Sequence, residues 1–112
     1  MGARSRTKGK AGEREVAARL RRLFPDARRG IQSRGGGAEA ADVVVPHLHV
    51  EVKRQRRPNP VAALEQAVAD AKPGLWPVAY TRRDRGEWIV TMRADDFEEL
   101  FGQWLIETGR GK

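Results

Sequence analysis

The first apolar run along the chain predicts a helix over residues 12–24. Its apolar side chains recur every three or four residues, and a proline follows them: Val16, Ala17, Leu20, Leu23, Phe24 and Pro25. On a helical wheel Glu13 falls within the apolar stripe, whereas Glu15 points away from it. We therefore expect the Glu13 side chain to face the protein interior.

Residues 27–53 carry strand patterns instead. Residues 27–33 suggest a short strand, and the three glycines at 35–37 suggest a flexible turn or a close backbone approach. A β-branched run at 42–45 and a strictly alternating run at 48–53 flank Pro46 and His47. These two runs predict a β-hairpin, with Val50 and Val52 on its buried side.

The second half of the chain adds a helix, two strands and a last helix. Asn59 is a good N-cap for the first of these helices, whose expected apolar face is Val61, Leu64, Val68 and Ala71. Strands are expected at 75–81 and 87–92, and the last helix has an apolar stripe of Phe97, Leu100, Phe101, Trp104 and Leu105. The order predicts an α/β fold: a mixed five-stranded sheet flanked by helices, with a right-handed crossover between the strands at 48–53 and 75–81.

Both ends of the chain lack a means of packing. Residues 1–10 are basic and almost without apolar side chains, so we expect a mobile basic arm there. Residues 11–108 are expected to form a single domain, and residues 109–112 a flexible tail.

Composition narrows the function. The 112 residues carry a net charge of +7, and the pI is near 10.8, which favours a polyanionic partner such as DNA, although a merely soluble basic surface would have the same charge. The absence of cysteine excludes disulfides, thiolate metal sites and cysteine nucleophiles. No stretch has the length of a membrane span or the character of a signal peptide, so we expect no membrane partner and a cytoplasmic location.

The hairpin brings charged residues together. A two-residue loop at Pro46 and His47 pairs positions that sum to 93, so Asp42 lies opposite Glu51, and Lys53 shares their face. Neighbouring carboxylates repel, and a bound cation relieves the repulsion; oxygen ligands favour Mg²⁺ or Mn²⁺. Such a metal polarises a scissile phosphate. The alternative is an ordinary hairpin surface, because the pattern E-x-K is common.

These residues resemble the core of the PD-(D/E)xK nuclease superfamily, with Asp42 as the Asp and Glu51-Val52-Lys53 as the E-x-K. Ala41 stands where the family motif has Pro, which is not a ligand. Lys8-Gly9 followed by Glu13 at the opening of a helix is similar to the start of archaeal-type Holliday junction resolvases. Residues 29–42, 49–54, 86–88 and 92–93 are similar to small phage-encoded resolvase-like nucleases. The likeness covers residues 8–101.

The resemblance implies a restriction-endonuclease-like core, a Mg²⁺ cofactor that Mn²⁺ can replace, and a homodimer. By the same likeness the metal ligands are Glu13, Asp42, Glu51 and Val52, and the catalytic residues are Glu13, Ser33, Asp42, Glu51 and Lys53.

Positive charge brackets this site along the chain and predicts a phosphate track, with a solvated charged loop as the alternative. The residues expected to bind DNA are Arg4, Arg6, Lys8, Lys10, Arg28, Arg29, Arg34, Arg54, Arg56 and Arg57. His47 and His49 lack partners of the zinc type, so turn and surface roles are expected for them. The tryptophans Trp76, Trp88 and Trp104 suit a core or a dimer interface.

Together the patterns favour a metal-dependent endonuclease, and the resemblance implies that it resolves four-way junctions by paired symmetric nicks. Two such cuts require two active sites, so we expect a two-fold dimer. A less selective phage DNA nuclease and a non-catalytic DNA-binding module stay open as alternatives. The expected partners are branched or duplex DNA and a second copy of the chain.

Overall fold

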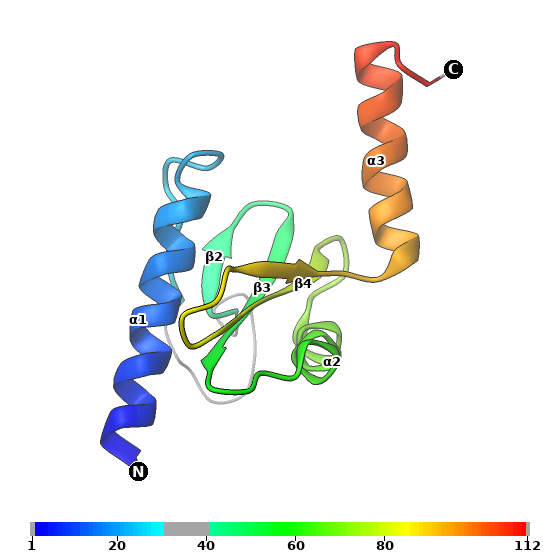
Figure 1. Ribbon diagram of the computed structural model, residues 1–112. Coiled ribbons are helices and arrows are strands. Elements are labelled where there is room, and N and C mark those ends of the chain that lie inside the picture. Colours follow the sequence, from blue (N-terminus) through cyan, green and yellow to red (C-terminus); the bar gives the residue numbers. More distant parts are fainter. Residues whose placement is uncertain (1, 31–40, 112) are drawn as a thin grey trace.

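The computed structural model describes residues 2–30 and 41–111 (Figure 1). Three helices and five strands follow one another along them: α1 (Gly2–Leu20), β1 (Arg28–Arg29), β2 (Val43–Val45), β3 (Leu48–Gln55), α2 (Pro60–Asp70), β4 (Trp76–Arg83), β5 (Ile89–Thr91) and α3 (Ala94–Thr108).

The strands form one sheet in the order β1-β2-β3-β4-β5. Neighbours are antiparallel except for β3 and β4, which are parallel and are joined through α2. The predicted α/β fold with a mixed five-stranded sheet flanked by helices is thereby confirmed. The parallel connection between the two long central strands is the predicted crossover.

The two helices nearest the sheet cover its opposite sides. Side chains of α1 join one apolar core with valines of β2, β3 and β4: Val16, Ala17, Leu20, Val43, Val45, Val50, Val52 and Val78. On the other side α2 contacts β3 and β4, with Ala63 and Ala67 buried. Both faces of β3 are therefore covered, so its polar residues are not on an open surface.

Helix α1 begins at Gly2, so residues 2–10 are helical and not the mobile arm that their composition suggested. The reason is cooperativity: once residues 12–20 are fixed by packing, each further turn adds hydrogen bonds without a new nucleation cost. Lys8 also forms an ion pair with Asp84, 2.9 Å away, which ties this end of the helix to the body. The helix ends at Leu20, and Leu23 is exposed.

The buried face of α2 differs from the predicted one. Asn59 caps the helix as expected, its Oδ1 accepting a hydrogen bond from the Ala62 N–H. Val61 and Val68, however, are exposed, and the buried residues are alanines. Small side chains allow the helix to approach a sheet face that already holds His49, so the alanines rather than the valines face inward.

Helix α3 stands apart from the rest of the protein (Figure 1). It ends at Thr108, and Gly109 caps it with a left-handed backbone conformation (φ 68°). Its predicted apolar stripe does not pack onto the sheet: Phe97, Leu100, Phe101 and Trp104 are each at least 40% exposed.

Candidate active site and metal centre

The hairpin of β2 and β3 has the predicted register. Val43 pairs with Val50, Val44 with His49 and Val45 with Leu48. Just before β2, the Asp42 N–H donates to the Val50 carbonyl at 2.9 Å, and Asp42 Oδ2 accepts from the Val52 N–H at 2.8 Å. These bonds fix the Asp42 carboxylate beside β3.

Most of the predicted site residues line one cleft of ≈ 500 Å³. Its walls come from α1, the hairpin and α2: Lys8, Gly9, Glu13, Asp42, Glu51, Val52, Lys53, Arg54, Gln55, Arg56 and Gln66. Three carboxyl groups that are far apart in the sequence thus share one cleft with several cations.

Glu51 is the most deeply buried of these carboxyl groups, at 3% exposure. Its Oε2 lies 4.0 Å from Lys53 Nζ, and its Oε1 has no hydrogen-bond partner among the described residues. Burial, followed by repulsion from Asp42, raises the Glu51 pKa to about 8. Repulsion between the two carboxyl groups therefore disfavours the state in which both are ionised, unless a further cation is bound.

Glu13 faces inward, as the helical wheel predicted, and is buried. Its Oε1 accepts from Arg29 Nε at 3.0 Å and lies 2.9 Å from Arg29 Nη2. Burial raises the Glu13 pKa, the hydrogen bond from Arg29 opposes this, and the Asp42 charge raises it further. Glu13 and Asp42 are thus near enough to feel each other's charge.

This donor set fits Mg²⁺ or Mn²⁺. Glu13, Asp42 and Glu51 supply only oxygen atoms, which hard divalent cations prefer. Val52 lines the same cleft, and its apolar side chain leaves its backbone oxygen as the available donor. Three buried carboxyl groups beside one another repel, and a bound cation would relieve this repulsion.

Some of the residues expected to bind DNA form ion pairs within the protein, and others are exposed. Lys8 pairs with Asp84, Arg29 with Glu13, and Arg54 with Glu15 at 2.9 Å. Lys10, Arg28, Arg56 and Arg57 are exposed. Arg4 and Arg6 belong to α1, whereas Ser33, Arg34 and the glycines at 35–37 lie outside the described residues.

Glu15 joins a polar network that the helical wheel did not predict. It forms ion pairs with Arg54 and Arg82, and it accepts from Trp88 Nε1 at 3.2 Å. The network connects α1 to β3, β4 and the segment before β5. Because its members span residues 15–88, no local pattern could have indicated it.

His49 was expected at the surface, and this expectation is wrong. The side chain is 2% exposed, because α2 covers this side of β3. Burial lowers the His49 pKa, which keeps the imidazole neutral at pH 7. Asp70, at the end of α2, lies beside His49 and Glu51, and the sequence analysis did not identify it.

Comparisons with known proteins add no relative. No family model matches the chain, and neither a curated protein nor a solved structure matches it. Within residues 2–30 and 41–111, none of the helices has the length and apolar character needed to cross a membrane.

Proposed function

We propose that this protein is a metal-dependent endonuclease that hydrolyses DNA phosphodiester bonds, with four-way junctions as its preferred substrate. The observation that carries the proposal is the convergence of Asp42, Glu51 and Lys53 with Glu13 in one cleft. An ordinary solvent-exposed E-x-K strand does not account for three buried carboxyl groups, of which Glu51 has a pKa of about 8. The mixed sheet, with this motif on β2 and β3, supports a restriction-endonuclease-like core.

Each residue of the cleft has a distinct role in this proposal. Asp42, Glu51, the Val52 backbone oxygen and Glu13 would hold Mg²⁺, which when bound polarises the phosphate and acidifies water. Lys53 orients the attacking water or stabilises the charge that develops on the phosphate oxygens. Arg29 holds Glu13 in place through their ion pair. Ser33 is kept as a catalytic residue on the basis of the family resemblance alone.

The cations around the cleft would hold the DNA backbone. Arg56 lines the cleft and is exposed, and Arg57 follows it. Contacts from such side chains to phosphates position DNA without reading its sequence. This supports recognition of DNA shape, which is what a four-way junction offers.

Paired cuts require two sites, so we propose that the working unit is a homodimer formed through α3. An amphipathic helix needs a partner for its apolar face, and α3 has none within the described chain. Helix α3 contains five acidic residues and no Lys or Arg. Residues 1–92 contain 19 of the 22 Lys and Arg residues and the ten remaining acidic residues, while Arg93, Arg110 and Lys112 flank α3.

This charge separation supports a second copy of the chain as the partner. An acidic, aromatic helix is complementary to the strongly basic body of the same protein. The body also exposes apolar residues, Ile89 and Val90 of the edge strand β5 and Val61 of α2. Docking of α3 against the body of a second copy would bury both apolar surfaces.

The test is cleavage of a labelled four-way junction beside duplex and single-stranded DNA, in Mg²⁺ or in EDTA. We expect symmetric nicks in the junction that disappear in EDTA and fall at least a hundredfold in Asp42→Asn. Asp26→Asn, which removes an exposed carboxylate outside the cleft, is the matched control and should cut normally.

The other outcomes each select another function. Equal cutting of all substrates would leave a less selective DNA nuclease. Binding without cutting by the wild type in either Mg²⁺ or Mn²⁺, with Asp42→Asn binding as tightly, would leave a non-catalytic DNA-binding module.

A further inference from the structure

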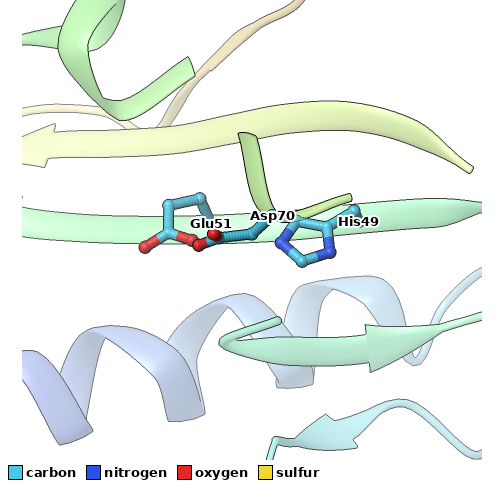
Figure 2. Close-up of side chains that lie close together, drawn as sticks. All are labelled: His49, Glu51 and Asp70. Atoms are coloured by element: carbon cyan, nitrogen blue, oxygen red, sulfur yellow. The ribbon is translucent and has the colours of Figure 1, made fainter. Parts of the chain in front are cut away.

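A second group of ligand atoms lies behind the proposed active site. His49 and Glu51 come from β3, and Asp70 reaches them from the end of α2 (Figure 2). Each residue offers one ligand atom, and these atoms all lie within 4.8 Å of one another. Alternate residues of a strand share a face, which places His49 and Glu51 on the side that α2 covers.

Two of these side chains have buried polar atoms without partners. His49 Nε2 and Glu51 Oε1 make no hydrogen bond within residues 2–30 and 41–111, and both residues are more than nine-tenths buried. An unsatisfied buried polar atom costs roughly 1 to 3 kcal/mol, so such atoms usually mark a bound water, an ion or a functional role. One ligand atom of each residue lies within 4.8 Å of the exposed Asp70 carboxylate, through which an ion can enter.

We propose that His49, Glu51 and Asp70 form a second cation position, which selects a divalent transition metal ion such as Zn²⁺ over Mg²⁺. The imidazole decides this preference, because nitrogen donors suit Zn²⁺ and its neighbours in the first transition row, whereas Mg²⁺ demands oxygen. Bonds of about 2.1 Å place neighbouring donors roughly 3.0 to 3.5 Å apart. Rotation of the exposed Asp70 side chain can shorten its own distances to the ligand atoms of His49 and Glu51.

The two cation positions share Glu51. One oxygen of its carboxylate faces Lys53, while the other has no partner. The second position does not depend on nuclease activity: it needs His49 and Asp70, whereas the proposed catalytic position needs Glu13 and Asp42. A variant in one set therefore separates the two.

The experiment is calorimetric titration of Zn²⁺ into the full chain at neutral pH, with excess Mg²⁺ present to fill the catalytic position. We expect Asp70→Asn to weaken Zn²⁺ binding at least tenfold. Asp42→Asn, and Glu65→Gln on the exposed side of α2, should retain it. Unchanged Zn²⁺ binding in Asp70→Asn, or its loss in Asp42→Asn, would overturn the proposal.

A second measurement observes the ligand directly. The ring ¹⁵N resonances of His49 should shift when Zn²⁺ is added and stay in place when Mg²⁺ is added. Resonances that do not move at saturating Zn²⁺ would also overturn the proposal, whatever the heat of binding. Junction cleavage in Mg²⁺ alone is read separately, so a failure of the nuclease proposal leaves this result intact.

Discussion

At the scale of single residues, Glu51 combines the properties expected of a metal ligand. A carboxylate that is buried and close to Asp42 favours its protonated form, and Lys53 compensates only in part, at a distance of 4.0 Å. Binding a divalent cation would replace the proton. In the proposed site, the charge state of this one side chain would therefore link metal binding to pH.

The metal-free protein should lose stability as pH rises toward 8. The raised Glu51 pKa means that the folded state keeps a proton which the unfolded state releases near its usual pKa of 4.5. Its contribution is complete below that value and is lost as pH rises through about 8, at up to about 1.4 kcal/mol per pH unit. The lowered pKa of His49 has the opposite effect on stability, which rises with pH below about pH 6.5 as the unfolded-state imidazole loses its proton. Between pH 7 and 8 the Glu51 effect dominates.

Urea unfolding in EDTA at pH 7 and pH 8 measures this effect. The free energy of unfolding of the wild type should fall over this interval, while that of Glu51→Gln should change much less. Equal slopes for the two proteins would show that Glu51 does not carry a raised pKa.

At the scale of elements, the site depends on how closely α1 approaches β3. A Cβ atom added at Gly12 would lie 2.9 Å from Arg54 Cβ and 3.5 Å from Val52 Cγ1, so this position accepts no side chain without movement. One residue later in α1, Glu13 enters the cleft. A glycine in the helix thus allows the contact that places a carboxyl group in the site.

Two glycine substitutions in α1 should have opposite effects on stability. Alanine favours a helix over glycine by about 1 kcal/mol, and Gly9 has nothing within 4 Å of an added Cβ, so Gly9→Ala should raise the melting temperature. In Gly12→Ala the clash with β3 should cost about 1 to 3 kcal/mol of stability. This cost should outweigh the gain in helix propensity and lower the melting temperature. Thermal unfolding of both variants measures these two effects. A higher melting temperature in Gly12→Ala would contradict the close contact between α1 and β3.

At the scale of the whole molecule, charge and apolar surface are divided between two parts. The body is strongly basic, whereas α3 is acidic and presents stacked aromatic rings, with Phe101 5.7 Å from Phe97 and 5.3 Å from Trp104 between centroids. Stacked, half-exposed rings on a helix are typical of an interface. These features support the proposed dimer, which the mass in solution tests.

The mass in solution should be twice 12.5 kDa. Phe101→Glu places a charge within the apolar stripe of α3 and should yield a monomer, measured by light scattering during gel filtration. Ile106→Glu introduces the same charge on the opposite side of α3, where the side chain is 79% exposed, and should leave the dimer intact. A wild-type monomer at tens of micromolar, or equal effects of both variants, would contradict the proposed interface.

Local pattern was enough wherever neighbouring residues determine the outcome. The register of the hairpin follows from two turn residues and a strict alternation, so the pairing around Asp42 and Glu51 was predictable. The inward direction of Glu13 follows from the helical period, and the Asn59 cap from its side chain and the proline after it. These features require no knowledge of distant parts of the chain.

Other features depended on which elements meet. His49 appeared to be a surface residue because a strand pattern does not show that a helix covers its polar side. The alanines of α2 face inward only because β3 and β4 lie beneath them, and Asp70 joins His49 across 21 positions of sequence. Burial and the pairing of distant charges are properties of the assembled layers.

The sequence by itself therefore determined the strands, their succession along the chain, the hairpin register and the identity of the acidic and basic residues in the motif. Period, turn chemistry and charge are encoded in short segments, where the physical forces act between near neighbours. The tertiary structure alone decided the extension of α1, the burial of His49, the network around Glu15 and the separation of α3. Each of these depends on contacts between remote segments, whose free energy no local pattern contains.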